Sequence, residues 1–350
     1  MKKINKIISL MKEKILILDG AMGTMIQKNN LSEDDFRGKK FKSLNKPLSG
    51  NNDILNLTFA KLIYDIHRSY LDAGADIIET NTFNSTRISQ TDYNCEKHSY
   101  DLNYHGGIIA RNAVDDYLKE NPNQIKFVAG VIGPTNRTCS MSPNVDNPGF
   151  RNIEFDELMR DYEVSVGALI EAAVDFILIE TVFDTLNAKA ALMAIRNIEK
   201  KKKTRIPIMI SATITDLSGR TLSGQTIEAF YNSIIHSSPL IVGLNCALGP
   251  RELEPYLIEL NRISESFVSI HPNAGLPNAF GGYDETPDSM GKFVRDWSAN
   301  GYINIVGGCC GTTPAHISEL KKISDNATTF FDDTKNKSSG KHDTSKKKDV

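Results

Sequence analysis

Short runs of β-branched and other apolar residues alternate along this chain with longer segments of helical periodicity. That alternation predicts parallel strands joined by crossover helices. We expect about eight strands, the number that a closed (β/α)8 TIM barrel needs. The predicted strands cover residues 15–19, 75–82, 127–133, 174–182, 206–214, 240–245, 267–273 and 303–307.

Three of the connecting segments have clear helical patterns. Residues 58–73 carry one apolar stripe and are followed by Gly74, a typical residue after a helix C-terminus. Residues 155–173 repeat that pattern, and residues 184–202 end in a lysine run that suits a helix C-terminus. The segment after the first strand, 19–24, lacks the glycine spacing of a dinucleotide-binding loop, which favours the barrel over an open doubly wound sheet.

The composition and the ends of the chain limit its partners and its domains. A formal net charge of -2 gives no bulk attraction to nucleic acid or to an anionic membrane. The apolar run within the basic start, residues 1–14, is too short for a signal peptide or a membrane span. We expect a leading helix there. The barrel should occupy residues 15–332, and the polar segment 333–350 should be a disordered tail or a truncated interdomain linker.

Two polar segments interrupt the strand–helix rhythm. Residues 32–56 follow the first strand, and residues 140–152 follow the third and contain two prolines and a glycine. Long loops of this kind are often functional. We predict that both are loops at the barrel mouth, by which we mean the face where the C-terminal ends of the strands open.

The chain has five cysteines, and their odd number argues against a disulfide framework and for a reducing cytoplasm. Cys95 and Cys139 are expected to act as small apolar core residues. The other three, Cys246, Cys309 and Cys310, each follow a predicted strand and should therefore meet at the mouth. Zinc is the usual ion for several thiolates without redox chemistry, and three sulfurs leave one position open for an incoming thiol.

Acidic residues form a second group at the strand ends. Asp19, Glu79 and Glu180 each end an apolar strand, where a charge is costly unless it has a partner. They are candidates to bind the ammonium group of an amino acid, while the backbone amides after Gly20, at residues 21–23, could hold its carboxylate. The alternative is that these acids cap neighbouring helices or are solvated.

Several motifs resemble those of a known family. Residues 17–24 (ILDGAMGT), 79–83 (ETNTF), 243–246 (GLNC) and 307–311 (GGCCG) resemble the homocysteine S-methyltransferase family. Two further segments, SMSPNV at 140–145 and PNAGLP at 272–277, are similar to the N-terminal homocysteine-binding module of cobalamin-dependent methionine synthase. The resemblance extends over about residues 15–324.

The resemblance implies zinc bound by Cys246, Cys309 and Cys310, and an amino-acid pocket that includes Asp19 and Glu180. It also suggests that Asn273, near the mouth, occupies the open zinc position when substrate is absent. Further expected pocket residues are Gly20, Ala21, Met22 and Glu79.

The implied reaction makes methionine from L-homocysteine, whose zinc-bound thiolate attacks a methyl group. The expected donor is methylcobalamin, carried on another module or chain and methylated from 5-methyltetrahydrofolate. The cobalamin-binding and folate-binding modules of such an enzyme do not fit within 350 residues, so they are expected partners. Two alternatives remain: a stand-alone enzyme that uses S-methylmethionine as donor, and a non-catalytic module in which zinc only stabilises the fold.

Overall fold

The computed structural model describes residues 2–278 and 282–327 of the chain. Eight parallel strands pair in the order β1-β8-β7-β6-β5-β4-β3-β2. Between the two ends of this order, Leu18 bridges Ile77, and the amide of Asp19 donates to the Ile77 carbonyl at 3.0 Å. The sheet therefore closes into the (β/α)8 TIM barrel that the alternating sequence pattern predicts.

Every predicted strand is present, although all eight are shorter than the apolar runs that predict them. Residues of these runs beyond the paired segments enter the loops at either end of the barrel, where the ladder stops. The strands are β1 (Leu16–Ile17), β2 (Ile77–Glu79), β3 (Phe127–Ile132), β4 (Phe176–Val182), β5 (Ile208–Ala212), β6 (Ile241–Asn245), β7 (Phe267–His271) and β8 (Ile305–Val306).

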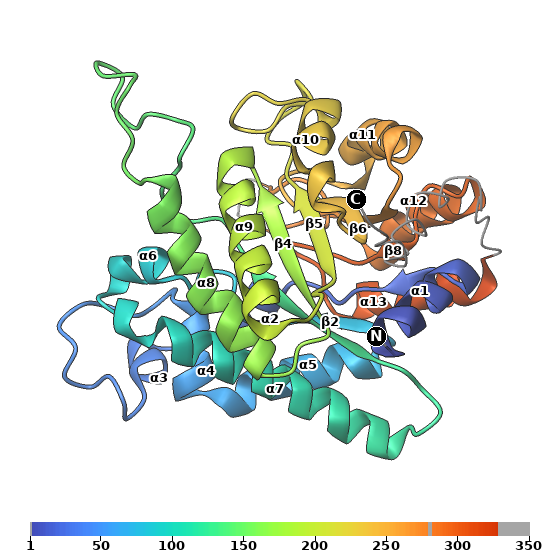
Figure 1. Ribbon diagram of the computed structural model, residues 1–350. Helices are drawn as coiled ribbons and strands as arrows, with labels where there is room; N and C mark the ends of the chain where they lie inside the picture. The colour runs from blue at the N-terminus through green and yellow to red at the C-terminus, as the bar shows by residue number, and fades with distance from the viewer. Residues whose placement is uncertain (1, 279–281, 328–350) are drawn as a thin grey trace, which may run out of the picture.

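Helices surround the strands (Figure 1). The three helices predicted from periodicity are α5, α8 and α9, and the side chain of Asp184 caps the start of α9 by accepting from the amide of Leu186 at 2.9 Å. The helices are α1 (Lys2–Glu13), α2 (Met22–Gln27), α3 (Glu33–Arg37), α4 (Leu55–Thr58), α5 (Ala60–Asp72), α6 (Arg87–Gln90), α7 (Ser99–Glu120), α8 (Phe155–Glu171), α9 (Thr185–Lys202), α10 (Ile227–Ile234), α11 (Pro250–Ile263), α12 (Pro287–Ala299) and α13 (Pro314–Asn326).

The interior of the barrel changes from apolar to polar along the strands. Near the N-terminal ends of the strands, inward side chains such as Phe127, Phe176 and Phe267 form one apolar cluster, which Ile7 and Met11 of α1 complete. Further along β4, β5, β6 and β7 the inward positions become polar; the buried polar residues there are Glu180, Ser211, Asn245, Ser269 and His271. Since alternate residues share a face, these four strands supply apolar packing at one end and polar groups at the other.

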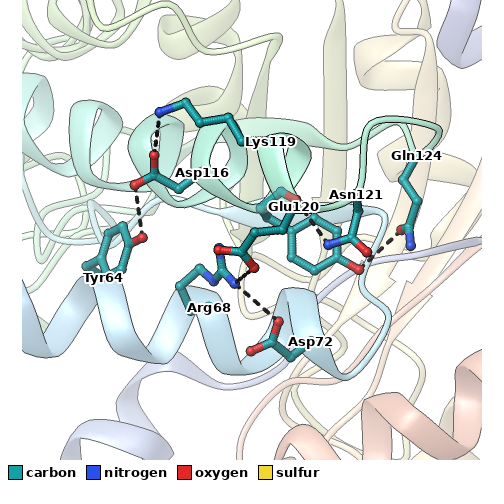
Figure 2. A network of polar contacts seen from close by, with 9 residues as sticks. Tyr64, Arg68, Asp72, Asp116, Lys119, Glu120, Asn121 and Gln124 are labelled. Carbon is teal, nitrogen blue, oxygen red and sulfur yellow. Dashed lines mark hydrogen bonds and ion pairs between the residues drawn. The ribbon is translucent and has the colours of Figure 1, made fainter.

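Polar contacts join helices α5 and α7 on the outer surface of the barrel (Figure 2). The Arg68 guanidinium pairs with Glu120 at 2.6 Å and with Asp72 at 3.7 Å, and the Tyr64 hydroxyl donates to Asp116 at 3.0 Å. These acids are largely exposed, so the pairs contribute little to stability. The contacts orient two helices on the outer wall of the barrel.

The segment 32–56 corrects one prediction, because it is not a continuous loop. It contains α3, a 3-10 turn at Asn52–Ile54 and the start of α4. Ser32 and Asp35 form a capping box that starts α3, a signal that the polar composition of the segment concealed. In contrast, segment 140–152 has no helix or strand, and Figure 1 shows the chain between β3 and α8 projecting from the barrel.

The remaining predictions about the chain ends have different outcomes. Residues 2–13 form helix α1, while the polar segment expected at 333–350 lies outside the described residues. Within the described part of the chain, no helix combines the length and the apolar character needed to span a bilayer.

Candidate functional site

The three cysteines after strands β6 and β8 meet at the barrel mouth. The sulfur atoms of Cys246, Cys309 and Cys310 all lie within 4.8 Å of one another, and those of Cys246 and Cys310 are 3.8 Å apart. All three are free thiols and partly exposed. In contrast, Cys95 and Cys139 are buried in the apolar core, as predicted.

The backbone around the cysteines fixes where their sulfurs point. Strand β7 lies between β6 and β8, and its C-terminal end accepts amide hydrogens from both sides: Cys246 donates to the His271 carbonyl at 3.3 Å, and Cys309 donates to the Pro272 carbonyl at 2.8 Å. Cys246 and the following Ala247 have φ values of 59° and 57°, a left-handed conformation that costs about 1–3 kcal/mol per residue. This strained turn redirects the chain as it leaves β6 and places the Cys246 sulfur beside that of Cys310.

The donor set fits a zinc ion. A tetrahedral site with zinc–sulfur bonds of about 2.3 Å has sulfur–sulfur edges of about 3.8 Å, which is the distance between Cys246 and Cys310. The hydrogen bonds from Cys309 to Cys246 and Cys310, followed by burial, raise the pKa of Cys309 well above its ordinary value. Three adjacent thiols cannot all ionise unless a cation balances their charge, and a divalent ion that prefers sulfur supplies that charge.

Beside the sulfurs, acidic groups and a histidine form a second cluster. Asp19 is almost fully buried after β1, Glu79 ends β2, and Glu180 is buried in β4. One oxygen each of Glu79 and Glu180 and a ring nitrogen of His271 lie within 4.8 Å of one another. The structure thus brings together the three carboxylates predicted from the strand ends.

Two of these carboxylates have unsatisfied acceptors. Asp19 Oδ1 and Glu79 Oε1 are buried without a hydrogen-bond partner among the described residues. Burial, and then the charge of Glu180, raises the pKa of Glu79 well above its ordinary value, and burial with a smaller contribution from Glu180 does the same for Asp19. Such groups need a cation or a proton, so the cluster fits the ammonium group of an amino acid.

The turn after β1 also lies at the mouth, although one of its amides is already engaged. The Ala21 amide donates to the Thr312 hydroxyl at 3.2 Å, and the Tyr70 hydroxyl donates to the Ala21 carbonyl at 3.2 Å. Gly20 precedes this contact, and Met22 begins helix α2. Ala21 therefore fixes the turn through its own amide and carbonyl.

Asn273 follows β7 and is buried near the cysteines. Its amide donates to the Leu248 carbonyl at 3.1 Å, and its side-chain Oδ1 has no partner among the described residues. A buried amide oxygen without a donor needs a cation, a water molecule or a substrate hydrogen. This is the property expected of a residue that fills an open metal position.

Sequence reasoning missed two residues of the acidic cluster. The His271 Nε2 atom lies 3.2 Å from Glu180 Oε2, and the Asn245 side chain donates to the Thr181 hydroxyl at 2.8 Å and to Glu180 Oε2 at 3.5 Å. The signal was available, since both residues occupy inward positions near the C-terminal ends of strands, where a core residue would be apolar.

A closed parallel barrel with thiols and unsatisfied carboxylates at its mouth defines the class: an enzyme that acts on a small polar molecule held at the strand ends. The chain matches the homocysteine S-methyltransferase family over residues 16–324, which is most of its length. The chain therefore belongs to the homocysteine S-methyltransferase family and is a methyltransferase, as the motif resemblance implied.

The fold is similar to that of the homocysteine methyltransferase MmuM from Escherichia coli. The metallated form of that enzyme matches with a TM-score of 0.70 and 23% identity, over 90% of this chain and 98% of that one. The oxidized form of that enzyme matches with a TM-score of 0.70 and 22% identity, over 89% of this chain and 96% of that one. The apo form matches with a TM-score of 0.66 and 22% identity, over 90% of this chain and 98% of that one. At these identities the similarity shows the shared fold, and the chemistry must be argued from the residues.

Proposed function

We propose that this chain is a zinc-dependent homocysteine S-methyltransferase module that holds zinc through Cys246, Cys309 and Cys310. The observation that carries the proposal is the cluster of three free sulfurs with a 3.8 Å edge, beside a pocket of unsatisfied carboxylates. Bound zinc would lower the pKa of a thiol entering its remaining position, so that the thiol becomes a thiolate nucleophile at neutral pH.

The residues of the mouth would orient homocysteine. Its ammonium would lie against Asp19, Glu79 and Glu180, where it satisfies the buried oxygens and balances their charge. Its carboxylate would face the first-turn amides of α2, beginning at Met22. With both ends of the amino acid fixed, the sulfur has a single approach to the cysteine cluster, and this restriction is the contribution of the protein to the rate.

The reaction forms a bond between the homocysteine sulfur and the methyl carbon while the bond from that carbon to the donor breaks, and the donor keeps the electron pair. The product, methionine, is a neutral thioether, and a bound zinc ion would hold it less strongly than the thiolate. Asn273 Oδ1 has no partner among the described residues, which supports the idea that it would act as a ligand when substrate is absent.

The donor we favour is methylcobalamin carried on another module or chain, because the mouth has features of a docking surface. Side chains on the loops after β3, β5 and β7 are exposed although apolar: Val145 at 95%, Leu217 at 74%, Leu222 at 59% and Leu276 at 50%. In a parallel barrel these loops open on one face. Exposed apolar side chains around a site are typical of surfaces that contact a partner. A small sulfonium donor such as S-methylmethionine would not need them.

The first experiment measures zinc content, proton release and zinc-edge X-ray absorption while L-homocysteine is added to the reduced protein. We expect one zinc per chain, one proton released and a fourth sulfur neighbour. A matched pair of variants tests the ligands: Cys309→Ala should lose zinc and activity together, while Cys139→Ala, which removes a buried thiol outside the site, should keep both. Zinc retained by Cys309→Ala at full stoichiometry would contradict the proposal.

A donor panel then separates the two methyl sources. Methylcobalamin and S-methylmethionine are offered separately to the zinc-loaded chain with L-homocysteine, and methionine is measured. Turnover with methylcobalamin alone supports the modular enzyme, and turnover with S-methylmethionine alone supports the stand-alone one. If homocysteine neither adds a sulfur to zinc nor is methylated by any donor, zinc has only a structural role.

A further inference from the structure

A buried histidine contacts the acidic cluster from inside the barrel. His271 is 1% exposed and Glu180 is 7% exposed, and His271 Nε2 lies 3.2 Å from Glu180 Oε2. His271 Nδ1 has no partner among the described residues. A carboxylate oxygen can only accept, so Nε2 carries the hydrogen in this contact. His271 therefore donates its Nε2 hydrogen to Glu180.

The backbone beside Glu180 is irregular. The β4–β5 register shifts between Ile179 and Val182, and Thr181 has a φ of 56°. Asn245 of β6 holds that bulge: its Oδ1 accepts from the Thr181 amide at 3.0 Å, and its Nδ2 donates to the Thr181 hydroxyl at 2.8 Å. These contacts fix the backbone at the bulge, but the direction of the Glu180 carboxylate depends on its own partners.

Both side-chain donors near Glu180 reach the same oxygen. His271 contacts Oε2 at 3.2 Å and Asn245 contacts it at 3.5 Å, a distance at the limit of a hydrogen bond. The hydrogen bond from His271 is thus the stronger of the two. The other oxygen of Glu180, Oε1, accepts from neither of these donors. Two neighbouring acidic groups, Asp19 and Glu79, interact unfavourably with a charged Glu180, and a donor on Oε2 offsets that interaction.

We propose that His271 is a positioning residue for substrate recognition: its Nε2–H fixes Glu180 Oε2 so that Oε1 faces the ammonium group of the amino-acid substrate. The proposal rests on the function proposed above and extends it by assigning amine recognition to a histidine that contacts neither the sulfur nor the methyl donor. The residue acts through Glu180, and its effect should therefore depend on whether the ligand has an amine.

The test compares two thiols on the zinc-loaded protein: L-homocysteine and 4-mercaptobutyrate, which lacks the amine. The variants are His271→Gln, whose amide can still reach Glu180, and His271→Asn, whose shorter amide cannot. Loss of a hydrogen bond to a charged group corresponds to about 10- to 100-fold in affinity. We expect His271→Asn to weaken homocysteine binding by about that factor and 4-mercaptobutyrate by less than about 3-fold, and His271→Gln to restore homocysteine binding to within about 5-fold.

Two controls distinguish positioning from general damage. Zinc content is measured for each variant, because the His271 backbone carbonyl also accepts from the Cys246 amide. In a Glu180→Gln background, His271→Asn should have no further effect on homocysteine, since the two residues act as one unit. With a working donor, KM for homocysteine should rise while kcat stays within about 3-fold.

Equal weakening of both thiols, or no weakening of either, would overturn the assignment of His271. If His271→Asn weakens homocysteine binding as much in the Glu180→Gln background as in the wild type, the assignment of His271 is also overturned. If the wild-type protein binds neither thiol, the proposed function itself fails. If the wild type binds both thiols but His271→Asn weakens both equally, only the assignment of His271 fails.

Discussion

A second buried histidine, His67 in α5, leads to a prediction about stability. Its side chain is 0% exposed, and neither ring nitrogen has a hydrogen-bond partner among the described residues. Burial lowers its pKa from 6.5 to about 3. Replacement by leucine removes two unsatisfied polar atoms and the titrating group together, while an apolar side chain still fills the space.

The sign and size of the effect follow from linkage. The folded-state pKa is below the unfolded one, so the unfolded chain takes up a proton below pH 6.5 while the folded chain stays neutral down to about pH 3. His67 therefore lowers the stability of the wild type as pH falls, by about 2 kcal/mol at pH 5 relative to pH 8. Leucine should give about 1 kcal/mol of extra stability at pH 8 from the removed unsatisfied groups, and about 3 kcal/mol at pH 5.

The assay is urea unfolding of wild type and His67→Leu at pH 8 and pH 5, with the difference between the two proteins as the readout. Taking the difference cancels the other titrating groups, which are common to both chains. Histidine-selective NMR provides a direct check, since the His67 ring should stay neutral at pH 5. An equal difference in unfolding free energy between the two proteins at pH 8 and pH 5 would refute the reasoning. It would mean that His67 in the folded protein takes up a proton as readily as in the unfolded chain.

Five further substitutions test other parts of the structure. Gly311→Ala should reduce zinc affinity, because Gly311 has a φ of 82° and an added Cβ would lie 2.4 Å from Tyr283 Cγ. The control Gly224→Ala has a similar φ of 89° but nothing within 4 Å of the added Cβ, so it should leave zinc affinity unchanged. Competition for zinc with a chelator measures the affinity of both variants. Gly243→Ala should destabilise the barrel by about 2 kcal/mol or more, since its Cβ would lie 2.0 Å from Ser269 Oγ. Gly167→Ala within α8 meets nothing closer than 4.0 Å and should stabilise by up to about 1 kcal/mol; urea unfolding distinguishes these outcomes. Asp53→Asn should stabilise at pH 7, because burial raises the pKa of Asp53 to about 6 and the wild type loses about 2 kcal/mol between pH 4 and pH 6 as the unfolded carboxyl ionises first. Equal pH profiles for both proteins would contradict this.

The sequence by itself determined the barrel and the positions from which its chemistry comes. Apolar runs that alternate with amphipathic segments have few compact solutions, and the parallel barrel is one of them. Polar residues that interrupt such runs at the strand ends, among them Asp19, Glu180 and Cys246, must then lie on one face. The capping box of α3 was also readable, but the polar composition of segment 32–56 concealed it.

Only the tertiary structure decided which of these residues meet. Cys246 and Cys310 are 64 positions apart and His271 and Glu180 are 91 apart, and no local pattern links either pair. Their distances depend on the order of strands around the barrel, on the left-handed turn at Cys246 and on the bulge at Thr181. Periodicity indicates which side of a strand a residue faces, but closure and register of the barrel determine its neighbour across the interior, because those depend on packing of the whole chain.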